Sequence, residues 1–472
     1  MKRMLCLLLP ALLLLISCGV WTDDGGTEYE KELLMREVDL SPSIVINPVL
    51  YFLNSAGTKL EAETRELTVP QDDMREKYVV RALLGGPVSS SLLPVAQGYE
   101  LQNIELLPDV VNVYLNKEGV RRETELINMK MALAATLSDY TGKTFINVFV
   151  NGAQVGYRGV PTGALQKSND DLSEELNLMQ QRAQADSPTL QAVLYFLDSS
   201  ESLLLPETRR LAFHEKDYIT VLVEQMISGP EDAYSHKPVV ESTLILRGYN
   251  IADNAGGKKT VQLNFNMEPF FGSQKFIDSN RMAVAALTFT ICGFMPDVTG
   301  IEILVNGRST GGAVHRISDY QELLGSNLLL YLQSGTTSRV LLGVDRVIAQ
   351  EQSYHPMVIL TELMRGPSAA DNISDVESTM PVGVSAEDIA DVYIANDIIV
   401  LDISKNAKEV MQTVSADTEF VMVFSIVNTL TSIEGIRSVQ FLVEGERVEY
   451  LREGGVSIID PIMKNPGIIR YS

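Results

Sequence analysis

The segment Val49-Leu50-Tyr51-Phe52-Leu53 returns later in the chain as Val193-Leu194-Tyr195-Phe196-Leu197 and, more loosely, as Leu329-Leu330-Tyr331-Leu332. Each version is a mostly apolar run between polar residues, which is typical of a strand inside a sheet. The three versions follow one another at intervals of about 140 residues, the usual length of a small domain. The spacing therefore predicts one structural unit that is repeated three times.

Two further motifs follow each of these strands in the same order. The first is Leu84-Gly85-Gly86-Pro87, with the counterparts Ile227-Ser228-Gly229-Pro230 and Met364-Arg365-Gly366-Pro367. The second is Val148-Phe149-Val150-Asn151-Gly152, with the counterparts Ile303-Leu304-Val305-Asn306-Gly307 and Phe441-Leu442-Val443-Glu444-Gly445. Solenoid repeats are only roughly 20 to 50 residues long, so each unit is expected to be a complete small domain.

The first half of each unit reads as two strands and a helix. In the first unit, a second extended segment is expected at residues 65–69. In the second unit, one helical face is formed by Tyr218, Val221, Leu222 and Met226. Gly229-Pro230 then ends this helix, because proline cannot continue it. The motif is not a phosphate loop, since the helix precedes the glycine.

The second half of each unit continues with strands, a helix and a hairpin. Residues 261–266 alternate between apolar and polar side chains, as do 111–116 and 399–403, which predicts half-buried strands. A second helix follows, with the shared face Met282, Ala285, Ala286 and Phe289 in the second unit. An Asn-Gly or Glu-Gly pair then predicts a closing hairpin. The predicted order is β-β-α-β-β-α-β-β.

These elements predict an α+β fold made of three tandem small domains. In each domain, two helices are expected to cover one face of a mostly antiparallel sheet. The expected boundaries are a signal peptide at 1–17, an acidic tether at 18–43, domains at 44–163, 190–315 and 316–472, and a charged linker at 164–189. The linker reads as a solvated helix or a coiled segment. The short junction at 314–324 favours packing of the second domain against the third.

The composition limits the classes of partner. The chain has 472 residues, 38 Lys plus Arg and 61 Asp plus Glu, and its formal net charge is −23. This charge repels phosphate backbones, so no nucleic-acid partner is expected. Apolar residues make up 45% of the chain, which is enough for a packed core in each domain.

The N-terminus predicts a lipoprotein. Lys2 and Arg3 precede an apolar run at residues 4–16, and Leu15-Ile16-Ser17-Cys18 resembles a lipobox. The run is shorter than the roughly 20 residues that a transmembrane helix needs. Cleavage before Cys18 would let its thiol carry lipid, and two or more acyl chains such as palmitate hold a protein stably on a bilayer. We expect Cys18 to be the lipid attachment site, with the rest of the chain on the extracytoplasmic side.

Catalytic and metal motifs are weak throughout. Gly307-Arg308-Ser309-Thr310-Gly311 fits the G-x-S-x-G pattern, but no helix pattern follows it, so we interpret it as a turn. The histidines are scattered as His214, His236, His315 and His355. Their spacing predicts no metal site. Cys292 lies in an apolar stretch and reads as a small buried residue. The sequence thus predicts neither an enzyme nor a cofactor.

The repeated motifs resemble the GerMN domain, also called the sporulation and spore germination domain. The resemblance rests on the Leu-Tyr-Phe strand, the helix that ends at Gly-Pro, the second helix rich in Ala and Phe, and the strand that ends in Asn-Gly. It covers nearly all of the chain after the signal peptide. The third copy departs most, with Leu332 and Glu444 in place of Phe and Asn.

The resemblance implies a membrane-anchored lipoprotein that acts in spore formation and germination. Domains of this kind are similar to ring-building motifs, which assemble into envelope complexes, so envelope or sporulation channel proteins are the implied partners and a homo- or hetero-oligomer is implied as well. The implied location is the mother-cell membrane facing the forespore. A cell-wall protein that binds or remodels peptidoglycan in clefts between the domains is the alternative.

Overall fold

The computed structural model describes residues 43–70, 73–119, 121–167, 171–266, 280–309, 312–371, 373–433 and 435–470. The predicted signal peptide, Cys18 and nearly all of the predicted tether lie outside the described residues. The chain forms one compact unit over Pro42–Ser472. In the parts of the chain that the structure describes, no helix is long and apolar enough to cross a membrane.

In the first repeat, groups of strands are separated by two helices. Its elements are β1 (Ser43–Ile46), β2 (Val49–Asn54), β3 (Leu60–Thr64), β4 (Leu67–Pro70), α2 (Arg75–Leu84), β5 (Leu92–Leu93), β6 (Glu100–Leu106), β7 (Val110–Asn116), α3 (Glu123–Thr141), β8 (Phe145–Val150) and β9 (Ala153–Gln154).

The second repeat follows the same order after a linker helix, α4 (Leu172–Gln184). Its elements are β10 (Thr189–Asp198), β11 (Leu204–Ala212), α5 (Tyr218–Ser228), β12 (His236–Lys237), β13 (Ile245–Asp253), β14 (Lys259–Asn266), α7 (Arg281–Phe294), β15 (Val298–Val305) and β16 (Arg308–Ser309).

The third repeat adds one helix and two short strands to this order. Its elements are β17 (Gly325–Ser334), β18 (Leu341–Ala349), α8 (Pro356–Arg365), β19 (Val376–Glu377), β20 (Ile389–Ala395), β21 (Ile398–Ile403), α9 (Lys405–Met411), α10 (Ala416–Leu430), β22 (Ser438–Val443), β23 (Ile462–Met463) and β24 (Ile469–Arg470).

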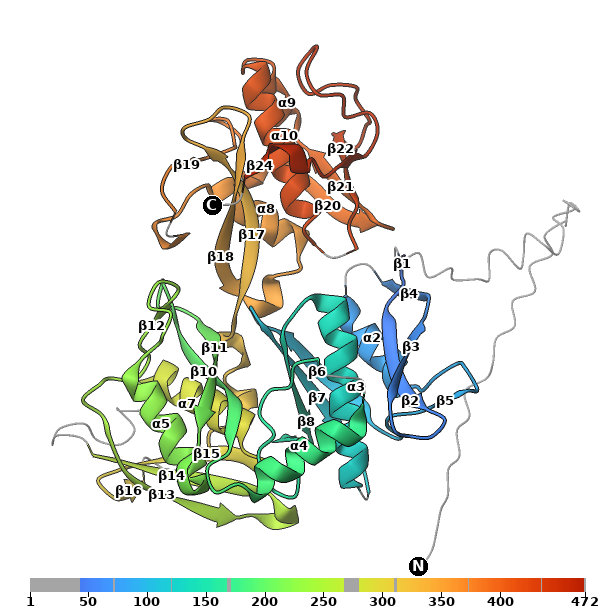
Figure 1. Cartoon of the computed structure of the whole chain (residues 1–472). Coiled ribbons are helices and arrows are strands. Elements are labelled where there is room, and N and C mark those ends of the chain that lie inside the picture. The colour runs from blue at the N-terminus through green and yellow to red at the C-terminus, as the bar shows by residue number, and fades with distance from the viewer. Residues whose placement is uncertain are drawn as a thin grey trace, which may run out of the picture. The chain divides into compact units, whose positions relative to one another are not determined.

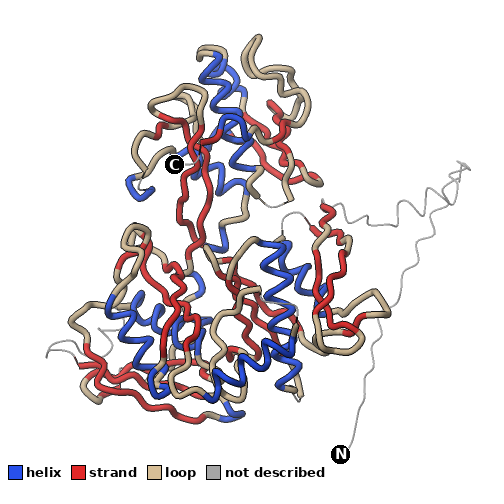
Figure 2. The backbone as a smooth tube through the Cα atoms, in the orientation of Figure 1, coloured by secondary structure: helices blue, strands red, loops and turns tan. Residues whose placement is uncertain are grey.

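The second and third repeats each have two sheets and the first has three, and in every repeat the long helix of the second half packs between a strand of the first hairpin and the later sheet. In the first repeat, α3 contacts β2 of one sheet and β8 of the later sheet, and Figure 1 shows this helix between them. The corresponding helices α7 and α10 contact β10 and β15, and β17 and β22. Figure 2 shows strands and helices alternating along the tube. The predicted α+β fold with two covering helices is therefore confirmed, and the single expected sheet is in fact two sheets, or three in the first repeat.

The later sheet of each repeat is mixed, although a mostly antiparallel sheet was expected. In the first repeat its order is β6-β7-β8-β9, with β7 parallel to β8 and the outer pairs antiparallel. The parallel pair arises because α3 connects β7 to β8, and a helical crossover returns the chain in the same direction. The predicted closing hairpin is confirmed as the antiparallel pair β8 and β9.

The first hairpin differs between the repeats. β10 and β11 pair continuously, whereas the first repeat divides the same hairpin into β2 with β3 and β1 with β4. Pro48 lies at the break, and proline has no N–H for the ladder. The main partner of β2 is thus β3, and the extended segment expected at 65–69 is only partly correct because β4 starts at Leu67.

The buried apolar residues join the first two repeats. One cluster combines Leu107, Val110, Phe145 and Ala164 with the core of the second repeat. The third repeat has separate clusters. The short junction predicts that the second and third repeats pack together, and β11 does contact β17, with Leu205 beside Gly325, although the buried clusters of the described residues are separate. The apolar side chains of that junction, from Tyr320 to Leu324, pack into the second repeat.

Candidate functional site: the docking faces of the repeats

The first strand and second helix of every repeat are joined by the same hydrogen bond. The N–H of Tyr51 donates to Oγ1 of Thr136 (3.1 Å), that of Tyr195 to Thr290 (3.3 Å), and that of Tyr331 to Thr429 (3.0 Å). These pairs establish which positions correspond in the three repeats. We call the surface formed by each tyrosine and its helix the tyrosine face.

The three tyrosine faces have different occupants. In the first repeat, the hydroxyl of Tyr51 contacts Asp139 and Lys167, and both of these side chains are about one-third exposed. In the third repeat, Nζ of Lys464 donates to the hydroxyl of Tyr331 (3.2 Å). In the second repeat, the hydroxyl of Tyr195 meets Nδ2 of Asn112, which belongs to the first repeat (3.4 Å). One tyrosine face thus receives a neighbouring repeat.

The C-terminal segment covers the face of the third repeat. The N–H of Asn465 donates to Oδ1 of Asn428 on α10 (2.8 Å), and Nδ2 of Asn428 donates to the carbonyl of Asn465 (3.1 Å). Ile468 and Ile469 pack into the same apolar cluster as Tyr331. This face is therefore closed by the chain itself.

The surface that occupies the face of the second repeat is a row of polar side chains across the mixed sheet of the first. Glu105, Asn112 and Asn147 lie side by side on β6, β7 and β8. Nδ2 of Asn112 donates to Oε2 of Glu105 (3.2 Å), and Nδ2 of Asn147 donates to Oδ1 of Asn112 (3.3 Å). We call this the outer row. All three residues are buried.

Aromatic contacts surround the buried outer row. The ring of Tyr114 stacks on that of Phe149 with the centroids 4.7 Å apart. Phe149 also reaches α7, where its ring would touch a Cβ placed on Gly293. At the edge of the sheet, Gln154 pairs with Pro296 as an isolated bridge. The first repeat therefore docks on the second through a row of one carboxyl group and two amides, flanked by apolar surface.

The second repeat has an outer row of its own at the corresponding positions. Asn250 donates to Oε1 of Gln262 (3.0 Å), and Gln262 donates to Oε2 of Glu302 (2.7 Å). The register of β13, β14 and β15 places these residues where Glu105, Asn112 and Asn147 lie in the first repeat. Here the row is exposed or half-exposed. A hydrogen-bonded polar row at the same positions is thus open to solvent in the second repeat, with its donors running in the opposite direction across the sheet.

A buried lysine holds the chain where it leaves the first repeat. Nζ of Lys130 donates to the carbonyls of Val155 (3.1 Å) and Gly163 (2.9 Å) and to Oγ1 of Thr162 (2.8 Å). Burial lowers the pKa of Lys130 to about 7. The next residue, Ala164, donates its N–H to Gln191 on β10. Lys130 thereby positions the segment that joins the first repeat to the second. The sequence did not predict this role, because a single lysine in an apolar helix carries no recognisable motif.

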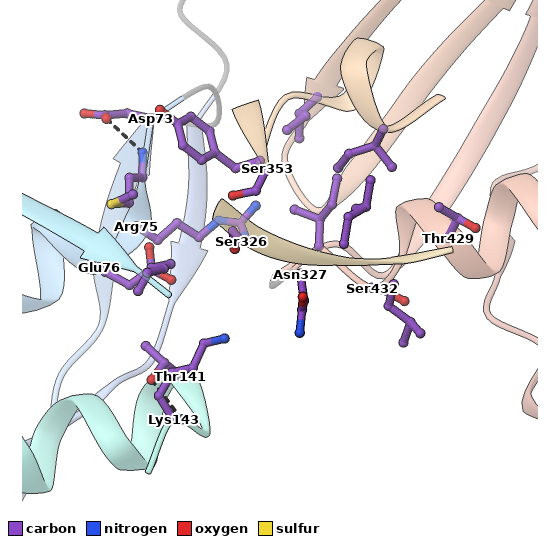
Figure 3. Close-up of a pocket in the computed structure, with 18 residues that line it drawn as sticks. Asp73, Arg75, Glu76, Thr141, Lys143, Ser326, Asn327, Ser353, Thr429 and Ser432 are labelled. Carbon is purple, nitrogen blue, oxygen red and sulfur yellow. Dashed lines mark hydrogen bonds between the residues drawn. The ribbon is translucent and has the colours of Figure 1, made fainter. Parts of the chain in front are cut away.

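A cavity of about 290 Å³ lies between side chains of the first and third repeats (Figure 3). Charged residues line one side of the cavity, and polar or apolar residues line the other. The charged side consists of Asp73, Arg75, Glu76 and Lys143. Burial raises the pKa of Glu76 and lowers that of Lys143, so burial disfavours the charged form of both side chains. A ligand that carries both charges and an apolar group, such as a short peptide, would match this lining.

The residues of the G-x-S-x-G motif do not form a nucleophile site in the part that is described. Ser309 is exposed on the two-residue strand β16, and its Oγ donates to Oε1 of Glu302 (2.6 Å). Thr310 and Gly311 lie outside the described residues. His315 instead contacts the hydroxyl of Tyr320 through Nδ1 (2.7 Å), and burial lowers the pKa of its ring.

The other residues that the sequence singled out are dispersed. His214 is in a short 3-10 turn, His236 is on β12 and His355 precedes α8. Among the residues that the structure describes, no group of His, Cys, Asp or Glu is arranged to hold a metal ion. Cys292 is buried in α7, as expected, and burial raises the pKa of its thiol to about 12.

Comparisons with known proteins match the repeats. The family model described as "Sporulation and spore germination" matches three times, at residues 49–156, 193–311 and 329–449. The spore germination protein GerM of Bacillus subtilis (strain 168) is 28% identical over 306 residues, which cover 60% of this chain and 77% of that protein.

Solved structures with similarity include the tandem GerMN domains of the sporulation protein GerM from Bacillus subtilis, with 18% identity and a TM-score of 0.24, covering 56% of this chain and 93% of that one. A putative lipoprotein from Clostridium perfringens has 20% identity and a TM-score of 0.17, covering 27% of this chain and 90% of that one. Because the family model matches most of the sequence, the chain belongs to the sporulation and spore germination family, with three copies of its GerMN domain, and this membership supports a role in spore formation or germination.

Proposed function

We propose that this chain is a lipid-anchored envelope protein that binds protein partners and takes part in assembling an envelope complex during spore formation and germination. The observation that carries the proposal is the open outer row of the second repeat, Asn250, Gln262 and Glu302. Its counterpart in the first repeat is buried against a protein surface. Repeated domains that expose such a surface suit an interaction module.

The proposed partners are envelope or sporulation channel proteins, or further copies of this chain. The half-exposed tyrosine face of the first repeat, with Lys167 and Asp139 at its surface, is a second candidate contact. The net charge of −23 gives the surface an acidic character that favours partners with basic patches.

The proposed anchor is Cys18, after removal of residues 1–17. It would hold the chain on the extracytoplasmic face of the cell membrane, which in a sporulating cell is the mother-cell membrane facing the forespore. The chain belongs to the sporulation and spore germination family, and this membership supports the proposed location.

The contact surface is tested by site-specific photocrosslinking in sporulating cells. A photoreactive amino acid at Gln262 is expected to capture a protein partner, whereas the same group at the exposed Glu241, outside the row, is the matched control. Equal capture from both positions, or capture from neither, would contradict the proposed surface.

The location is tested with a C-terminal fluorescent fusion followed through the growth cycle. The fusion should collect at the membrane around the developing spore, and a Cys18→Ala version should lose this enrichment. A uniform signal in the envelope of vegetative cells would contradict the sporulation role.

A second candidate function is peptidoglycan binding, and the cavity of Figure 3 is the observation that favours it. Its mixed charges and apolar wall match the stem peptides of a cell wall. Retention on purified peptidoglycan in high salt, reduced by Arg75→Gln with Lys143→Gln, would support this function. Equal retention of the variant would count against the cavity as the site.

A further inference from the structure

Glu105 is a carboxylate that is buried where three parts of the chain meet. Its side chain lies in the outer row of the first repeat, and the residue is only 2% exposed. Oε2 accepts from the hydroxyl of Tyr114 (2.9 Å) and from Nδ2 of Asn112 (3.2 Å). Oε1 accepts from Nε2 of Gln321 (2.9 Å), which belongs to the junction between the second and third repeats. The carboxylate thus links the first repeat to the junction, beside the face of the second repeat.

The groups that face Glu105 are neutral. From β7 they are Asn112 and Tyr114, from β10 Tyr195, and from the junction Gln321. Burial raises the pKa values of Tyr114 and Tyr195 above the ordinary value for tyrosine, so neither hydroxyl ionises at neutral pH. On the junction, Glu322 follows Gln321 and pairs at the surface with Arg281 of α7. A carboxylate at this position is therefore solvated by neutral donors alone, which compensate an ionised group incompletely.

The corresponding residues of the other repeats are not acids. The register places Asn250 of β13 and Tyr393 of β20 at the position of Glu105, and both are exposed. The acid of the second outer row is Glu302, at the opposite end of the row and half-exposed. The buried acid thus occurs in the row that is covered by another repeat.

We propose that Glu105 is a proton-sensitive latch, which favours docking of the first repeat on the second when protonated and weakens it when ionised. In an undocked arrangement the outer row would face water, as the row of the second repeat does. Docking would then transfer an ionised Glu105 from water into a buried surface without a cation, at a cost that a protonated carboxyl avoids.

The direction of the pH effect follows from the pKa of Glu105. Burial raises this pKa from its ordinary 4.5 to about 7 in the docked state, although the donors Asn112, Tyr114 and Gln321 act in the opposite direction. A raised pKa gives its full stabilisation below the ordinary value, and this stabilisation is lost as the pH rises to the pKa of the docked state. The docking equilibrium constant is therefore expected to fall about tenfold per pH unit across this interval.

The experiment measures energy transfer between dyes on the first two repeats of the full chain. The dyes are placed at Val88→Cys and Ile245→Cys, which are strongly exposed positions, in a Cys6→Ser, Cys18→Ser background where the remaining thiol, Cys292, is buried. Between pH 4.5 and 8 the transfer efficiency should fall as the pH rises. The Glu105→Gln variant should stay docked at every pH, because its amide cannot ionise.

Two further variants keep the test decisive. Glu241→Gln removes an exposed acid of the second repeat outside the outer row and should leave the pH profile of the parent unchanged. Gln321→Lys places a cation beside Glu105 and should preserve docking at pH 8, with folding of each variant checked by circular dichroism. A flat profile in the parent protein, or the same fall with Glu105→Gln as without it, would overturn the latch.

Discussion

An arginine closes the first helix of every repeat, buried in the second and third repeats and half-buried in the first. Arg209 and Arg346 lie on β11 and β18, and Arg65 lies between β3 and β4. Each donates to the carbonyl of the glycine that follows the helix, at 2.7 Å for Arg209 and Arg346 and 3.0 Å for Arg65. Each also donates to a carbonyl of the last helical turn. Carbonyls at a helix end have no partner within the helix, so these arginines satisfy them. The Gly-Pro motif and the arginine therefore end the helix together, and we call this arrangement the arginine clamp.

The groups that contact the arginine of the clamp differ in the third repeat. Arg65 and Arg209 lie over the rings of Phe52 and Phe196, at 5.5 and 5.1 Å from the centroids. Leu332 replaces this phenylalanine in the third repeat. There, Arg346 pairs with the buried carboxylate of Asp371 at 2.6 and 2.9 Å. Arg65 and Arg209 also form ion pairs, with Glu63 and Glu207. The third repeat therefore differs by lacking the aromatic contact and by pairing its arginine with a more deeply buried acid.

The Arg346→Ala variant is expected to lose about 3–5 kcal/mol of unfolding free energy, because it leaves Asp371 buried without its cation. Urea denaturation of the variant measures the loss. Arg339→Ala is the matched control, since Arg339 and Asp417 form an exposed pair that contributes less than about 1 kcal/mol. Equal losses for the two variants would contradict the clamp.

The closing hairpin of the third repeat contains a strained residue. Asn151, Asn306 and Glu444 occupy the same turn position with φ of 53°, 50° and 52°. Asparagine tolerates this left-handed conformation better than glutamate does. Glu444→Asn is expected to stabilise the third repeat by about 0.5–1 kcal/mol, because it relieves this backbone strain. The shorter side chain can still accept the N–H of Lys405, as Asn151 accepts that of Lys117. A lower melting temperature than that of the parent would show the reverse.

The thiol of Cys292 is expected to be inert in the folded protein. Burial raises its pKa to about 12, and a thiolate is the reactive species. In a Cys6→Ser, Cys18→Ser chain, a thiol reagent should react only after urea unfolds the second repeat. Rapid labelling at neutral pH without urea would contradict this burial.

At the scale of elements, the hydrogen bond between the first strand and second helix fixes how each repeat is folded. Thr290→Val keeps the shape of the side chain but leaves the buried N–H of Tyr195 without its acceptor, and should cost about 1–3 kcal/mol. Thr290→Ser retains the oxygen and should cost less. Hydrogen exchange at Tyr195 measures the effect, and equal protection in the two variants would rule out this bond as the anchor.

The elements themselves were largely predictable, because local patterns determine them. Alternation in 261–266, the helical face from Tyr218 to Met226, and the stop at Gly229-Pro230 each reflect a contact inside one repeat. The division into separate sheets and the parallel pair β7 and β8 depend on how the helices cross, which no local pattern records. The outer row was not predicted either, since its members are ordinary polar residues until another repeat covers them.

At the scale of the whole molecule, the repeats are unequal in how they bury their surfaces. The first repeat covers its outer row against the second, the third closes its tyrosine face with its own C-terminal segment, and the second leaves its row open. Similar domains can thus present different surfaces to partners. The difference comes from a few side chains, such as Phe149 and Glu105, that are absent from the corresponding positions of the other repeats.

This inequality predicts how the chain unfolds. The first two repeats share a buried cluster and the third has its own, so the first two should lose protection together and the third separately. Phe149→Ala, at the shared surface, should lower the stability of both the first and second repeats. Phe441 lies in the core of the third repeat. Phe441→Ala should lower the unfolding free energy of that repeat alone by about 3–5 kcal/mol. Hydrogen exchange with mass spectrometry resolves the three repeats in one urea series. A single transition for the whole chain, or an effect of Phe149→Ala confined to the first repeat, would show that the shared cluster does not couple them.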